Sequence, residues 1–502
     1  MSVSVNAISA VMGFQLKKGN FGSDGKYLPQ AICILAEANH ANQGTVSTDM
    51  VQVSSAKDIA GKCGWGSPAH LIGRQLFPAS GGGTKLPVYL MPQLEASGAV
   101  AKVITITPTG TVTKNKTHYL VINGRKVVDN GTYAINLEVG DNATAVCNKI
   151  RAAIANVLGC PVLGTGTSTA ILTAKWKGLT SDDIIVRIDT NGDAAGISYG
   201  IVNTTSGSGT PTVSDSLALI GNEWRTIVIN SYGFVDATLA ELEAFNGKPD
   251  DENPTGRYAE TKWKPILALT GTTLDDPTSL TSDSDRGDNV TVFPTVAPLT
   301  ENFPFEVAAA WAVPYGNMAQ NAPHTEIIGA ELTDISAPPA GSIPAMTDQN
   351  FREVCVNKGC STVDLVGGVY TIVDAVTTYN VAGEFPEHYK YPRDLNIFFN
   401  LKYRQRVLEQ EKLFGKTLVK DKDVVTATGV IKPKMWKADV GELIDQAVKD
   451  ALIVDAAFSK AGLVVEISTQ NPNRMDTSYP VQISGIGRVV NTVVTGGYST
   501  GA

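Results

Sequence analysis

Short apolar segments that alternate with helical stretches constrain the fold of this 502-residue chain more than any other feature. Strands buried on both faces of a sheet read as continuous apolar runs, and parallel strands need long crossovers between them. After residues 226–230, Leu239, Leu242 and Phe245 repeat at helical spacing. Between residues 213 and 345 the pattern predicts a largely parallel sheet covered by helices. The strand segments there are residues 226–230, 266–269 and 290–293, and residues 31–36 predict a buried strand earlier in the chain.

Residues 101–212 differ in pattern and predict an inserted, compact β-rich domain with its own core. Its first strand alternates apolar and polar side chains, and the dipeptide Asn123-Gly124 is a strong hairpin signal. One helix follows, for which Asn142 is the expected N-cap. Residues 204–211 are rich in Ser, Thr and Gly, and end the insertion as a linker.

The C-terminal part of the chain predicts two long helices, at 394–414 and 439–460, and two β pairs. The first pair is a hairpin that turns at Gly367 and Gly368. The second pair closes the chain and lacks a further strand to complete a sheet. It comprises residues 481–484 and 489–494.

The expected fold class is a multidomain α/β (α+β) protein with a central α/β core, an inserted β-rich domain and extended N- and C-terminal arms. The first 25 residues contain few apolar side chains and cannot bury themselves alone. The predicted divisions are 1–25 as the N-terminal arm, 26–100 as the first part of the core, 101–212 as the insertion, 213–345 as an α/β domain, 346–479 as the C-terminal domain and 480–502 as a C-terminal β arm.

Composition argues against several functions. The net charge of −8 does not suit a protein that binds nucleic acid directly. No apolar run approaches the roughly 18 residues that a membrane span requires, so we expect no membrane insertion. The N-terminus has no secretory-signal pattern. Six scattered cysteines without a Cys-x-x-Cys pair predict reduced, mostly buried thiols.

The sequence contains none of the catalytic, nucleotide-binding or metal-binding motifs that we searched for. There is no HExxH, GxSxG or GxGxxG pattern, and the five histidines are never spaced like a ligand pair. The acidic runs at 250–252 and 275–276 lie beside proline, which favours acidic loops over an acid/base pair. We therefore predict no catalytic residue, no cofactor and no metal site.

One segment carries a strong positive charge. Residues 390–437 contain twelve lysines and arginines against five acidic side chains, whereas the whole chain is acidic. Two interpretations remain open for this segment. It is either a solvated helix face with a basic loop, or a surface that binds an acidic partner.

Three stretches resemble a known family in their order and spacing. The alanine-rich FEVAAAWA at 305–312 is followed by ELTDISAPP at 331–339. Further on, NKGCSTV at 357–363 precedes the glycine hairpin and the sequence TTY. Together with the insertion, these stretches resemble the contractile tail sheath proteins of bacteriophages and phage-tail-like particles, particularly the Mu-type sheaths. Thr333 stands where that family usually has glycine, and Asp374 where it usually has arginine.

The resemblance implies a role for the two chain ends. In that family, the arms of neighbouring subunits complete one small sheet, which is β-augmentation between chains. The unpaired strand edges expected at both ends of this chain agree with such an exchange. The resemblance assigns Val3, Val5 and Ile8 to one strand, and Val481, Ile483, Val489, Val490 and Val493 to the others.

The resemblance also implies a function. Sheath subunits polymerise helically around a tail tube and contract to drive the tube through the host envelope, which leads to genome ejection and host entry. The implied partners are further copies of the chain, the tail tube protein, and the baseplate and tail terminator proteins. The implied location is the virion tail, assembled in the host cytoplasm.

Within such a sheath, we expect residues 346–502, with discontinuous support from residues 1–100, to lie near the tube and the insertion to face outward. Candidate residues that contact an acidic tube are Lys402, Arg404, Arg406, Lys412 and Lys416. Two alternatives stay open: another self-assembling tail or surface-layer protein, and a β-rich glycan-binding or hydrolytic protein.

Overall fold

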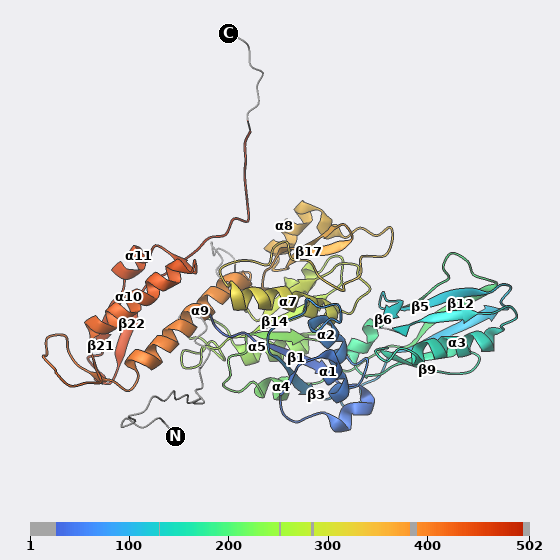
Figure 1. Ribbon diagram of the computed structural model, residues 1–502, viewed down its shortest axis with the longest axis horizontal. Coiled ribbons are helices and arrows are strands. Elements are labelled where there is room, and N and C mark those ends of the chain that lie inside the picture. Colours follow the sequence, from blue (N-terminus) through green and yellow to red (C-terminus); the bar gives the residue numbers. More distant parts are fainter. Residues whose placement is uncertain (1–26, 130, 250–252, 283–285, 382–388, 495–502) are drawn as a thin grey trace, which may run out of the picture.

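The computed structural model describes residues 27–494, apart from residues 130, 250–252, 283–285 and 382–388. Its centre is a six-stranded sheet in the order β15-β14-β13-β1-β3-β2 (Figure 1). Only β2 runs antiparallel to its neighbour, so the predicted largely parallel sheet is confirmed. The strands are β1 (Ile32–Glu37), β2 (Val51–Val53), β3 (Val88–Gln93), β13 (Ile227–Asn230), β14 (Leu267–Thr272) and β15 (Val292–Val296).

Helices cover both faces of this sheet, which explains why its strands are apolar throughout. Ile32 and Ile34 of β1 enter the core on one face, and Cys33 and Leu35 enter the core on the other. The first face is covered by α1 (Ala56–Cys63), α2 (Pro68–Leu76) and α7 (Pro304–Asn321), and the second by α4 (Ser214–Ala218) and α5 (Asp236–Asn246).

Residues 103–205, which lie between β3 and α4, form two antiparallel sheets with the helix α3 (Ala143–Ala155) packed on them. The side chain of Asn142 accepts a hydrogen bond from the backbone N–H of Ala145 at 3.0 Å, so the predicted N-cap is confirmed. The sheets are ordered β12-β4-β10-β9 and β11-β5-β8. Their strands are β4 (Val103–Gly110), β5 (Lys116–Ile122), β8 (Ala134–Leu137), β9 (Val162–Thr165), β10 (Ala170–Ala174), β11 (Val186–Asp189) and β12 (Ile197–Thr205), and a small hairpin joins β6 (Val127–Val128) to β7 (Gly131–Thr132).

After α7 the chain forms α8 (Gln349–Asn357) and the predicted hairpin of β16 (Thr362–Val366) and β17 (Val369–Asp374). Gly367 and Gly368 both have positive φ, which is why glycine occupies this turn. Three helices and three small strand pairings follow around a separate core. They are α9 (Pro392–Leu408), α10 (Pro433–Lys449), α11 (Ala456–Ala461), β18 (Thr417–Leu418), β19 (Val430–Ile431), β20 (Ile453–Val454), β21 (Val464–Ile467), β22 (Met475–Ser478) and β23 (Gln482–Ile483). A short helix, α6 (Thr278–Thr281), lies earlier in the chain, between β14 and β15.

The structure corrects two predictions for this region. The helix expected over 439–460 is broken, because Ala451 and Asp455 adopt positive φ and Asp455 caps a new helix, α11. The closing β pair is also wrong: β23 pairs with β20, and residues 489–494 form no strand. The expected N-terminal arm, residues 1–25, lies outside the described residues.

Candidate assembly surfaces

The place where an open α/β sheet normally binds a ligand is filled by the chain itself. That place lies beyond the carboxyl end of β1, because β3 and β13 continue from it in opposite directions. The side chain of Gln93 donates to the backbone carbonyl of Thr212 at 3.0 Å. At Gly178, a side-chain Cβ would lie 3.4 Å from the carboxylate of Glu37. The insertion and its linker therefore close this crevice.

Glu37 ends β1 beneath this cover and is buried. Burial raises its pKa to about 8, which the Tyr232 hydroxyl partly counteracts. Within the described ranges, no group of three or more His, Cys, Asp or Glu side chains is placed to hold a metal ion. No helix in the described part of the chain is both long and apolar enough to cross a bilayer.

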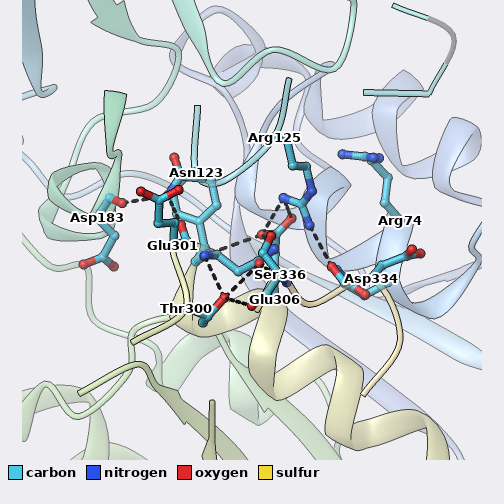
Figure 2. Close-up of polar contacts among 12 residues, drawn as sticks. Arg74, Asn123, Arg125, Asp183, Thr300, Glu301, Glu306, Asp334 and Ser336 are labelled. Atoms are coloured by element: carbon cyan, nitrogen blue, oxygen red, sulfur yellow. Dashed lines mark hydrogen bonds and ion pairs between the residues drawn. The ribbon is translucent and has the colours of Figure 1, made fainter. Parts of the chain in front are cut away.

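An ion pair joins the insertion to the body at the N-terminus of α7 (Figure 2). Nη1 of Arg125 lies 2.8 Å from both carboxylate oxygens of Glu306, whose side chain is fully buried. Glu306 also accepts a hydrogen bond from the backbone N–H of Phe303, in the first turn of α7. A carboxylate there is favoured by the helix dipole, and Arg125 neutralises its charge.

A second set of contacts lies beside the first in Figure 2. The side-chain amide of Asn123 donates to the backbone carbonyls of Asp183 and Glu301, at 2.9 and 3.1 Å. Arg187 binds the carboxylate of Glu301 through two nitrogens. The apolar core of the insertion continues into the body, with Trp176 against Phe303. The insertion is therefore fixed to α7 and its preceding loop, and its core is not separate.

The C-terminal segment is attached to the body at Arg488. Its guanidinium pairs with the buried carboxylate of Glu326 and lies 3.6 Å from the centre of the Tyr391 ring. Burial raises the pKa of Glu326, while Arg488 and Arg393 act in the opposite direction. After Arg488 the segment leaves the body (Figure 1).

The structure divides the residues predicted to form the arms. Val481 and Ile483 are half-buried and pack against the chain's own C-terminal core. By contrast, the side chains of Val489, Val490 and Val493 are 90%, 81% and 83% exposed. The remaining candidates, Val3, Val5 and Ile8, lie outside the described residues.

Strands β21 and β22 form a two-stranded sheet near α10. Among the strands that the structure describes, neither has a second neighbour. Both outer edges therefore present backbone groups that another strand can bind.

The five predicted basic residues lie on different surfaces. Lys402 and Arg406 line a groove beside the 256–264 segment. Arg404 points toward α10 instead, where its guanidinium lies 2.7 Å from the carboxylate of Asp450. Lys412 and Lys416 follow α9 and are exposed. The helical periodicity of α9 separates these side chains.

The described residues define a multidomain α/β protein with an inserted antiparallel β unit and a C-terminal segment that extends from the body, as the sequence predicted. No protein-family profile matches the chain, and no curated protein matches it. Among solved structures, the chain is similar to the sheath tail protein of Desulfitobacterium hafniense, with 12% identity and a TM-score of 0.46, over 95% of this chain and 100% of that one. It is also similar to a chain of the anti-feeding prophage baseplate, with 10% identity and a TM-score of 0.44, over 98% of this chain and 100% of that one.

Proposed function

We propose that this chain is the structural subunit of a contractile tail sheath, which polymerises helically around a tail tube. The observation that carries the proposal is the exposed valine segment after Arg488. Covering three large apolar side chains on an extended segment with a partner strand removes apolar surface from water, which is favourable. Such a segment is a donor for β-augmentation between subunits.

The acceptor in this proposal is the small sheet of β21 and β22. It has two outer edges, so it can receive one strand from each of two neighbours. One incoming strand is the C-terminal segment with Val489, Val490 and Val493, and the other is the N-terminal segment with Val3, Val5 and Ile8. Each subunit is then linked to its neighbours by main-chain hydrogen bonds.

The tube contact in this proposal involves Lys412 and Lys416, which are exposed at the end of α9. Phe414 lies between them with its side chain 85% exposed. Charge attracts an acidic tube surface, and the aromatic ring adds apolar contact area. Arg404 is engaged with Asp450, and Lys402 and Arg406 lie on another side of α9. In this proposal the 346–502 region lies near the tube.

Contraction in this proposal requires no catalysis. The free energy comes from two packings of the same subunits, which differ while the arms keep neighbours connected. The insertion faces outward and moves with the body, because buried polar contacts join it to α7. The baseplate and the tail terminator bind the two ends of the polymer.

Electron microscopy of the full-length protein tests this function. We expect hollow cylinders from the wild type, and none from a V490D/V493D variant, because charges cannot enter the shared sheet. An I343D variant is the matched control, since Ile343 is 76% exposed but lies outside the arm. It should polymerise normally.

Three results would contradict the proposal. They are a dispersed wild-type monomer, a polymer of another geometry, and cylinders that form equally well from V490D/V493D. The second result would favour a different tail or surface-layer protein. Saturable glycan binding by the monomer would favour a β-rich glycan-binding or hydrolytic protein.

A further inference from the structure

A basic groove of about 840 Å³ lies where α5, the 256–264 segment and α9 meet. Two of its cationic side chains come from α9, and three come from a segment about 140 residues earlier. The cationic residues are Arg257, Lys262, Lys264, Lys402 and Arg406, and the acidic residues that line the groove are Glu260 and Glu409.

Arg257 provides a fixed positive charge in this groove. Its side chain is nearly buried, and its three guanidinium nitrogens donate to the backbone carbonyls of Gly221, Glu223 and Lys264. The ring of Phe245 lies 5.2 Å away and restricts its movement. Carbonyl oxygens satisfy hydrogen bonds without neutralising the charge, so Arg257 remains an attractive centre for an anion.

The other cations in the groove interact unfavourably with one another. Burial lowers the pKa of Lys264, and the positive charges of Arg406 and Arg257 lower it further. In the part of the chain that the structure describes, none of the five groove cations forms an ion pair with a carboxylate. Like charges held together cost free energy, which an incoming anionic surface recovers.

The same chain carries a surface of opposite charge, which we call the acidic lobe. It is formed by α8, the β16–β17 hairpin and the strand segment at Glu331 that bridges to Thr371. Its acidic side chains are Glu331, Asp348, Glu353, Asp364 and Asp374. Arg352, which lies 3.5 Å from the carboxylate of Asp364, and Lys358 offset part of this charge, so the lobe stays negative. Val354 and Val366 expose apolar area on the lobe, as expected for a protein contact.

The groove and the lobe are built by different elements of the chain. Phe245 of the groove packs with the core under α5, while Tyr258 and Phe399 beside the groove belong to the same core as Val363 and Tyr370 of the lobe. Two different surfaces of opposite charge on one chain allow a head-to-tail contact between copies, which propagates into a helical array when the rotation does not close.

We propose that the basic groove receives the acidic lobe of a second copy of this chain. This inference deepens the proposed sheath function and rests on it, because it names a contact between the bodies of neighbouring subunits. The contact differs from arm exchange, since it joins globular surfaces through charge.

Charge reversal on each surface tests the contact in the full-length chain. We expect K264E/R406E and E331K/E353K each to raise the protein concentration required for polymerisation about tenfold, because two favourable pairs become repulsive. The variant with all four changes should return to within about twofold of the wild type. Electron microscopy and sedimentation measure the polymer, and circular dichroism verifies folding.

A matched control is K420E/K422E, which reverses two exposed lysines in the loop after α9. It should polymerise at the wild-type concentration. Normal polymers from K264E/R406E would overturn the groove contact. Failure of the four-change variant to recover would overturn the lobe as its partner. A wild type that forms no polymer at all contradicts the sheath function itself, whereas the other two outcomes contradict only this contact.

Discussion

Glu37 illustrates how burial in the fold changes the pKa of one side chain. It ends β1 under the linker of the insertion, and burial raises its pKa to about 8. In the unfolded chain the same carboxyl titrates near 4.5. The raised folded pKa means that the stabilising effect of the protonated form is complete below pH 4.5 and is lost as the pH rises toward 8.

We predict that E37Q loses this pH dependence. The stability of the variant relative to the wild type should increase from pH 5 to pH 9. The wild type loses stability over this range because its carboxyl ionises more readily in the unfolded chain, whereas glutamine does not titrate. Thermal unfolding at both pH values measures the difference in melting temperature. E138Q, which changes an exposed glutamate, is the control and should follow the wild type. Parallel curves for E37Q and the wild type would contradict the assignment.

At the scale of elements, the break after α10 determines the C-terminal domain. The helix ends at Lys449, and Ala451 follows with φ of 54°, in a conformation that favours glycine. The turn allows β20 to form and to pair with β23. The strained turn at Ala451 therefore positions β20, and β20 in turn holds β23, the strand after which the C-terminal segment leaves the body.

We predict that A451G stabilises the protein by about 1 kcal/mol, because glycine adopts this conformation without steric cost. A438G, at an exposed position inside α10, should instead destabilise it by about 1 kcal/mol. Urea unfolding measures both free energies. Equal effects of the two substitutions would show that the turn is not strained.

At the scale of the whole molecule, the buried Arg125–Glu306 pair connects the insertion to the central sheet. Removing one partner of a buried pair leaves the other charge uncompensated. The Asn123 and Glu301 contacts beside it act in the same direction. The insertion and the sheet should therefore unfold together.

We predict that R125M lowers the free energy of unfolding by about 3 kcal/mol. R125M/E306Q should recover most of that loss, because the neutral glutamine still accepts from the backbone at the start of α7. Urea denaturation followed by circular dichroism measures these values. A double variant as unstable as R125M would indicate that the charge is not the cause.

The sequence patterns predicted the elements better than the surfaces. Apolar runs identified β1, β13, β14 and β15, and Gly367 with Gly368 identified a hairpin, because these signals are local. The basic groove depends on residues far apart in sequence. Counting charges along α9 therefore identified only two of its five cations, Lys402 and Arg406. The pairing of Arg404 with Asp450 depends on how α10 packs against α9.

The anchoring of the last described residues at Arg488 has a mechanical consequence. Tension along the C-terminal segment enters the body through one guanidinium, which holds Tyr391 at the start of α9 and Glu326 after α7. In the proposed sheath, a pull from an adjacent subunit is thus delivered to α7 and α9 before it reaches β23. The two helices therefore carry the tension, and the two-residue pairing of β23 with β20 does not.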